Sequence, residues 1–270
     1  TGVVKNMGTS DINSFDLNWQ IDNGPINTQN ISGLTLTAGQ TYNYSHNTTW
    51  DATPGLYSLK VWVSNVNGAG VDGDLANDSL TKSISVASGS VARFPLYEKF
   101  SSSTCGPCYS FNTNYFNPFL STGTNAQDMA LINYQVNWPG NGDPYYTTEV
   151  GSRVAYYGIS AAPTLLIDSK EGTNSNVAQL QTDLNNAKIK PAYFGLTATH
   201  QIDIDNITVN INTLPYLTGN YVIQVAVVEK ETTGNVATNG ETSFHNVMMK
   251  MVPNPSGTLV NFTHDVANTQ

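Results

Sequence analysis

The chain has 270 residues, nearly twice the commonest domain length, so its length predicts two or three domains. Hydrophobic residues make up 39% and aromatic residues 10%, which argues against general disorder. Only 11% of the residues are charged, the net charge is −9 and there is no run of Lys or Arg, so the composition argues against a nucleic-acid partner.

The sequence contains no candidate for a membrane-spanning helix. Its longest apolar stretch, residues 221–228, is far shorter than the roughly 20 residues that such a helix needs. We therefore expect no transmembrane segment. Because the sequence starts at Thr1 rather than Met, we expect a processed or trimmed product.

Residues 1–88 have the pattern of an immunoglobulin-like β-sandwich. Short β-branched or alternating segments are separated by clusters of Asn, Gly, Asp and Pro, as in small all-β domains. The expected strands are residues 15–21, 34–37, 56–63 and 80–86. The small residues at 87–90, Ala-Ser-Gly-Ser, predict a linker and a domain boundary.

Residues 91–190 change to an alternation of strands and helices, which predicts an α/β layer. The expected strands are 93–100, 129–136 and 164–168, and the expected helices are 107–120, 145–157 and 177–188. Residues 191–270 return to a β pattern, with expected strands at 193–199, 207–212, 221–229, 244–252 and 259–264. Because a closed sandwich has about seven strands, this second immunoglobulin-like domain is expected to be incomplete.

The two cysteines form the motif Cys105-Gly106-Pro107-Cys108 between an expected strand and an expected helix. Unpaired backbone N–H groups at a helix start favour an anion, and a Cys-x-x-Cys loop lowers the thiol pKa from about 8.5 toward roughly 3.5–7.5. We therefore predict that Cys105 is the attacking thiolate and Cys108 the resolving thiol. Pro107 suits the first helical turn, where no donor is needed.

Two alternatives to redox chemistry follow from the motif itself. One is a static disulfide that closes the loop. The other is half of a zinc site, which requires four ligands in total. We expect no metal and no cofactor, because the only other soft ligands are scattered histidines at His46, His200, His245 and His264.

The order strand, Cys-Gly-Pro-Cys helix, strand, helix and strand resembles the thioredoxin fold. Its hallmark is a cis-proline facing the cysteine pair, and Pro163 in Ala162-Pro163-Thr164 matches that position. A cis X-Pro bond presents the preceding backbone groups to an extended peptide, which docks as an added strand. The resemblance implies that Thr104, Gly106, Pro107, Ala162 and Pro163 contact the substrate.

The sequence more specifically resembles a surface or secreted family of Gram-negative bacteria related to the one called outer membrane protein twenty-eight. The resemblance covers about residues 93–252 and implies an immunoglobulin-like domain after the redox layer. It is carried by the segments Trp138-Pro139-Gly140, Asp143-Pro144-Tyr145, Arg153-Val154-Ala155-Tyr156-Tyr157-Gly158-Ile159 and Phe244-His245-Asn246-Val247-Met248.

The chain departs from thioredoxins at two positions near the motif. Thr104 stands where thioredoxins usually have Trp, and Lys99 stands where they carry a buried acid that helps to move the proton of the second cysteine. Glu98 replaces that acid only if the strand turns it inward. We therefore name Glu98 and Lys99 as candidates for proton transfer. A thioredoxin-like fold that has lost its activity is a further alternative.

The preferred hypothesis is an extracytoplasmic thiol–disulfide oxidoreductase of a Gram-negative bacterium, acting in the periplasm, at the cell surface or after secretion. Its partners would be a client protein with cysteines and an unknown redox partner. The alternative is a surface binding or adhesion protein that uses an inactive thioredoxin-like scaffold. A carbohydrate-binding module in the first ninety residues rests only on Trp19, Trp50 and Trp62. Asp72, Asp74 and Asp78 form an acidic cluster, which we interpret as a solvated turn rather than a calcium site.

Overall fold

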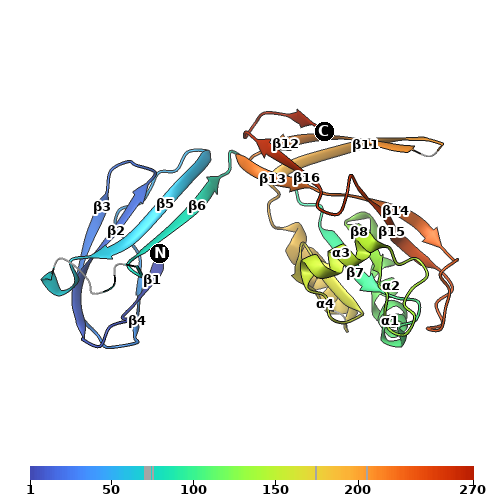
Figure 1. Cartoon of the computed structure of the whole chain (residues 1–270), viewed down its shortest axis with the longest axis horizontal. Coiled ribbons are helices and arrows are strands. Elements are labelled where there is room, and N and C mark those ends of the chain that lie inside the picture. Colours follow the sequence, from blue (N-terminus) through green and yellow to red (C-terminus); the bar gives the residue numbers. More distant parts are fainter. Residues whose placement is uncertain (70–73, 75, 174, 205) are drawn as a thin grey trace. The chain divides into compact units, whose positions relative to one another are not determined.

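The computed structural model describes residues 1–69, 74, 76–173, 175–204 and 206–270. Asp72 of the acidic cluster lies outside these residues. The chain divides into two compact units (Figure 1). One comprises 1–89, 214–219 and 262–270, and the other comprises 90–213 and 220–261. Strands predominate over helices and form several sheets, so the fold is a mostly β, multi-sheet arrangement.

The first unit packs a four-stranded antiparallel sheet against a two-stranded one. The larger sheet has the order β3-β2-β5-β6, and β1 pairs with β4. Phe15 and Leu17 lie on one face of β2 and are completely buried, together with Ile31, against side chains of β1 and β4. The bounds are β1 Gly2–Lys5, β2 Ile12–Ile21, β3 Asn27–Leu36, β4 Thr41–Tyr44, β5 Gly55–Ser64, the 3-10 helix η1 Val66–Gly68 and β6 Ser79–Val86.

The expected strands 15–21, 56–63 and 80–86 correspond to β2, β5 and β6, and the expected strand 34–37 overlaps only the end of β3; the sequence did not predict β1 or β4. Those two strands are four residues each, which is too short for an alternating pattern to stand out. The three tryptophans proposed for carbohydrate binding are all partly buried, and the Trp50 ring packs edge-on against Tyr57 at 4.8 Å between centroids.

The second unit is built on a six-stranded mixed sheet with the order β10-β9-β7-β8-β15-β14. The neighbours β7, β8 and β15 run parallel, and the outer pairings are antiparallel. The strand bounds are β7 Leu96–Ser101, β8 Ala130–Gln135, β9 Thr164–Ile167, β10 Lys170–Glu171, β14 Val225–Thr232 and β15 Phe244–Val252.

Helices cover both faces of this sheet (Figure 1). One face packs Tyr97 and Leu165 against a helical run, α1-η2-α2, and against α4; the other packs Phe100 and Leu166 against α3. The bounds are α1 Gly106–Phe111, the π-helix η2 Asn112–Phe116, α2 Asn117–Leu120, the 3-10 helix η3 Asn125–Gln127, α3 Thr148–Tyr157 and α4 Val177–Lys188. Among the described residues, no helix is both long and apolar enough to span a membrane.

Residues 191–270 differ from the expected second sandwich. The segment 244–252 forms β15 with the expected bounds, but it lies beside β8 and pairs Val247 with Asn133. The expected strand 221–229 is divided at Gln224 between β13 and β14. The remaining strands form two small sheets, a three-stranded one with the order β11-β12-β17 and the pair β13-β16. Their bounds are β11 Phe194–Asp203, β12 Asn206–Pro215, β13 Gly219–Ile223, β16 Thr258–Phe262 and, at the chain end, β17 Asn268–Thr269.

The physical reason for this difference is burial on both faces of β15. Val247, Met248 and Met251 are all at most 1% exposed, as expected for a strand inside a covered sheet. An apolar run of this kind indicates a buried strand but does not identify the sheet that it joins. The immunoglobulin-like interpretation of residues 191–270 is therefore wrong for β14 and β15.

Candidate functional site

Cys105 and Cys108 lie at the start of α1, just after β7, and form a disulfide. Cys105 is the N-cap residue of the helix, and the backbone N–H of Cys108 donates to Cys105 Sγ at 3.1 Å. Gly106 and Pro107 are exposed, whereas Cys105 is 1% and Cys108 0% exposed. The expected loop and helix start are present, but neither sulfur is open to solvent.

Ala162 and Pro163 lie beside the disulfide, at the start of β9. The bond between them is cis, and the Ala162 carbonyl oxygen is 3.6 Å from Cys105 Sγ. Since a disulfide sulfur carries no hydrogen, this is a contact rather than a hydrogen bond. The structure thus brings together residues 57 positions apart in the sequence.

Thr104 holds the loop on its other side. Its Oγ1 donates to the Pro139 carbonyl at 2.8 Å, and the neighbouring Ser103 N–H donates to Asp143 Oδ2 at 2.8 Å. Trp138–Pro139 is also a cis bond. The segments that carried the sequence resemblance, 138–140 and 143–145, therefore lie directly against the cysteine loop.

Lys99 points to the sheet face that α1 covers. Its Nζ donates to Asn112 Oδ1 at 2.8 Å and lies 5.0 Å from the centre of the Phe116 ring. Burial lowers the pKa of Lys99 from 10.5 to about 8, and the negative charge of Glu241 partly opposes this shift. Asn112 follows Cys108 by four residues, about one helical turn, so the two side chains lie on the same face of the helical run. Through its hydrogen bond to Asn112, Lys99 contacts this face.

Glu98 lies on the opposite face of the sheet, against α3. Its carboxylate accepts hydrogen bonds from Tyr134 and Tyr157 and forms an ion pair with Arg153 at 3.1 Å, all away from α1. Burial and the bond to Glu98 raise the pKa of Tyr157 to about 12. Burial lowers the pKa of Arg153, but Tyr134 and Glu98 outweigh it, so the net shift is upward. Of the two proton-transfer candidates, only Lys99 faces the helix that carries the cysteines.

Sequence reasoning missed a third wall of the site, the irregular segment 233–243 between β14 and β15. The Asn239 N–H donates to the Ser103 carbonyl at 2.9 Å, and its side-chain Nδ2 donates to the carbonyls of Ser102 at 3.1 Å and Cys105 at 3.4 Å. Asn239 Nδ2 also donates to Glu241 Oε2 at 2.7 Å. The only signal in the sequence is a polar loop, which does not reveal its contact with the motif.

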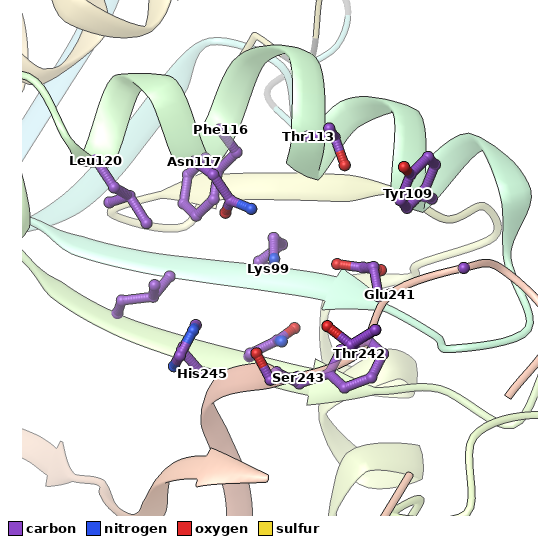
Figure 2. Close-up of a pocket in the computed structure, with 14 residues that line it drawn as sticks. Lys99, Tyr109, Thr113, Phe116, Asn117, Leu120, Glu241, Thr242, Ser243 and His245 are labelled. Carbon is purple, nitrogen blue, oxygen red and sulfur yellow. The ribbon is translucent and has the colours of Figure 1, made fainter. Parts of the chain in front are cut away.

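A pocket of about 310 Å³ opens beside this segment. Figure 2 shows Lys99 between the helical residues Tyr109 and Asn117 and the segment that carries Glu241. The Asn112 side chain links the two sides, because its Nδ2 donates to Glu241 Oε1 at 2.7 Å while its Oδ1 accepts from Lys99. Lys99 therefore lines a pocket, although it is only 6% exposed, whereas Glu98 is 0% exposed and does not line this pocket.

Several kinds of polar group surround the Cys105–Cys108 disulfide. Among the described residues, no group of three or more His, Cys, Asp or Glu side chains is arranged to hold a metal ion. The polar groups around the disulfide include backbone carbonyls, the side-chain amides of Asn112 and Asn239, the carboxylates of Asp143 and Glu241, and the Lys99 amine. What the arrangement offers chemically is one disulfide held against a carbonyl and a helix start.

No family model matches the chain, and no curated protein matches its sequence. Among solved structures, it is similar to HBP35 of Porphyromonas gingivalis, a Gram-negative bacterium, at 14% identity and a TM-score of 0.53. The match covers 67% of this chain and 64% of that one, so less than two thirds of HBP35 is spanned. Protein AGR_C_4864 of Agrobacterium tumefaciens matches at 16% identity over 67% of this chain and 78% of that one, with a TM-score of 0.44. The likeness to HBP35 shows a related fold.

Proposed function

We propose that this chain is a thiol–disulfide oxidoreductase that acts on protein cysteines through Cys105 and Cys108. The observation that carries the proposal is the Cys105–Cys108 disulfide at a helix start, with the Ala162 carbonyl 3.6 Å from Cys105 Sγ. A Cys-x-x-Cys pair placed in this way supports reversible exchange with a second pair of thiols.

In the oxidising direction, a client thiolate attacks Cys105 Sγ and breaks the bond to Cys108. Cys108 leaves as a thiolate and takes up a proton, and the client is joined to Cys105 by a mixed disulfide. A second client thiolate then attacks the client sulfur of this bond and releases Cys105. The client loses two electrons as its disulfide forms, and the cysteine pair gains them.

In the reducing direction, the same steps run backwards, with Cys105 attacking and Cys108 resolving. The Cys108 N–H that points at Cys105 Sγ would stabilise the Cys105 thiolate. Lys99, with its lowered pKa, is placed to exchange a proton with solvent near the helix of Cys108. Glu98 faces away and takes no part.

We propose further that the layer formed by β7, α1, β8, α3, β9, β10 and α4 is thioredoxin-like, within a surface or secreted family of Gram-negative bacteria. The order of these elements and the cis bond before Pro163 support this interpretation. Residues 1–88 would form an immunoglobulin-like sandwich. The protein would act outside the cytoplasm, and cell fractionation with antibody detection tests that location.

The decisive experiment combines a redox titration with client trapping. In Cys108→Ser, the Cys105 thiolate should attack a client that carries a disulfide, release one client sulfur as a thiolate and accumulate as a mixed disulfide, because no Cys108 is left to resolve it; Cys105→Ser should accumulate none. The titrated potential gives the direction of electron flow, because dithiol pairs of this kind span roughly −270 to −120 mV. The proposal fails if the wild-type chain neither oxidises nor reduces a client and Cys108→Ser traps none.

The burial of both sulfurs favours a second candidate, a surface binding protein with an inactive scaffold. With Cys105 1% and Cys108 0% exposed, the disulfide in this state is shielded like a structural one. This candidate predicts a pair that stays oxidised under mild reductant. Quantitative thiol labelling after graded reduction distinguishes it from the oxidoreductase.

A further inference from the structure

The segment 233–243 lies across the loop that carries the cysteines. It joins β14 to β15, which lie at one edge of the six-stranded sheet, whereas the motif follows β7 in the middle of that sheet. Asn239 is its central contact, with one backbone and two side-chain hydrogen bonds to the carbonyls of residues 102–105. Beside it, Gly240 lies close to the Tyr109 ring on α1.

The contacts that hold this segment are mainly polar. Asn235 is fully buried and bonds to Thr232 and Asp143, and Glu241 accepts from Asn112. In contrast, Val236, the largest apolar side chain of the segment, is 48% exposed. Few apolar contacts and solvent-exposed backbone are features of segments that open without unfolding the rest of a protein.

We propose that residues 233–243 form a removable cover over the Cys105–Cys108 pair, with Asn239 as the residue that holds it closed. The inference rests on the proposed function and adds its regulation. Both sulfurs are buried in the state where the Asn239 bonds to the loop are made, and in this state exchange with a large partner would be slow. When the Asn239 bonds break, the carbonyls of Ser102, Ser103 and Cys105 are released to water and the motif opens.

The cover also explains how a buried disulfide serves a protein client. A thiolate has to approach Cys105 Sγ in line with the bond to Cys108, which requires space on the exposed side of the loop. Opening supplies that space and frees backbone carbonyls that accept hydrogen bonds from an extended client segment. Asn239 is a positioning residue, since it acts through the loop and not on the sulfurs.

The test measures how fast two reductants of different size reduce the disulfide. Dithiothreitol and a thiol-terminated polyethylene glycol of protein size both convert the pair to two thiols and are themselves oxidised to disulfides. In wild type, the rate of disulfide reduction, normalised to the thiolate concentration of the reductant, should be much lower for the polyethylene glycol thiol than for dithiothreitol. Asn239→Ala should raise the rate with the polyethylene glycol thiol by about tenfold, because the variant loses the side-chain hydrogen bonds that hold the cover. The difference in rate between the two reductants should therefore become smaller.

Asn254→Ala is the matched control. Asn254 also lies in an irregular segment and accepts a hydrogen bond from a nearby backbone N–H, that of Ser256; within the described part of the chain its hydrogen bonds do not reach the motif. Its rates with both thiols should equal those of wild type. Asn239→Asp keeps the size of the side chain but loses its donor, so it should behave like Asn239→Ala. The inference is overturned if folded Asn239→Ala and Asn239→Asp both stay within about twofold of wild type.

Hydrogen exchange of the wild-type chain provides a test that needs no variant. If the cover opens by itself, the Asn239 amide should exchange faster than the amides of Val247 and Met248 in β15. Equal protection of all three contradicts an independent cover. The two tests measure how fast reductants reach the disulfide and how readily the segment opens. Neither measures the oxidation or reduction of a client, so the result of each is independent of the proposed function.

Discussion

At the scale of single residues, β7 carries two oppositely charged neighbours, Glu98 and Lys99, whose side chains point to opposite faces of the sheet. Glu98 is 0% exposed and paired with Arg153 on the α3 face, while Lys99 lies on the α1 face, lines a pocket and donates to the neutral Asn112 side chain. Alternation along the strand produces this separation. The sequence named both residues as candidates for proton transfer, and the register of the folded sheet was needed to show that Lys99 is the one that faces the helix.

The first prediction concerns Lys99. Its folded-state pKa of about 8 is below the ordinary value of 10.5, so between these pH values the unfolded chain binds the proton that the folded chain has lost. The free energy of unfolding of wild type, relative to Lys99→Met, should therefore rise with pH across this window, by up to about 3 kcal/mol. Urea unfolding of both proteins from pH 7 to above pH 10 measures this. Parallel curves for the two proteins would show that Lys99 keeps its ordinary pKa.

The second prediction concerns the buried pair of Glu98 and Arg153. Arg153→Leu leaves the Glu98 carboxylate buried without its cation, and it should lower the free energy of unfolding by about 3–5 kcal/mol. Tyr157→Phe, the control on the same helix, removes only one hydroxyl from that carboxylate and should lower it by about 1–2 kcal/mol. Denaturant unfolding measures both changes. An equal effect of the two variants would contradict the importance of the charge.

At the scale of elements, local patterns predicted the helices well and the sheet partners poorly. The helix expected at 177–188 is α4 with those bounds, because Leu180, Leu184 and Ala187 form one buried stripe. The strand expected at 244–252 is likewise confirmed as β15, but its partner is β8. Strand pairing between residues more than a hundred positions apart leaves no local signal, and neither does the contact of Asn239 with the cysteine loop.

The third prediction tests the position of β15. Met248 is 0% exposed and packs in the cluster that holds α3 on the sheet, so Met248→Ala should destabilise the second unit by about 2–5 kcal/mol. Leu259→Ala in β16 removes a side chain that is 70% exposed and should change stability by about 0.5 kcal/mol or less. Denaturant unfolding, followed by the hydrogen exchange of β8 amides, measures both. Unchanged protection of β8 in Met248→Ala would contradict the pairing.

At the scale of the whole molecule, the chain consists of two units with separate cores. The Phe15 cluster belongs to the unit that contains residues 1–89, and the Phe100 and Tyr97 clusters belong to the other. Length and the Ala-Ser-Gly-Ser segment predicted a boundary close to residue 89. They did not predict that residues 214–219 and 262–270 would join the first unit, since nothing in those short segments identifies their neighbours.

The fourth prediction follows from this division. Phe15→Ala creates a cavity in the first unit, and it should lower the stability of that unit by about 3–5 kcal/mol. Calorimetry should then show one transition moving to lower temperature while the other stays in place, because independent cores unfold separately. The rate of Cys105–Cys108 reduction should not change. A shift of both transitions together would show that the two units unfold as one.

The distance in sequence between the cysteine motif and Asn239 has a consequence for biosynthesis. Asn239 follows Cys105 by 134 residues, so a chain that emerges from its N-terminus presents the thiols long before the amide that later bonds to the backbone carbonyls of their loop. During that interval, oxidants and foreign thiols reach the nascent motif freely. If the proposed cover limits access, disulfide formation should be easiest while the protein is still being made, and oxidant supplied during expression should give a larger oxidised fraction than oxidant added after purification.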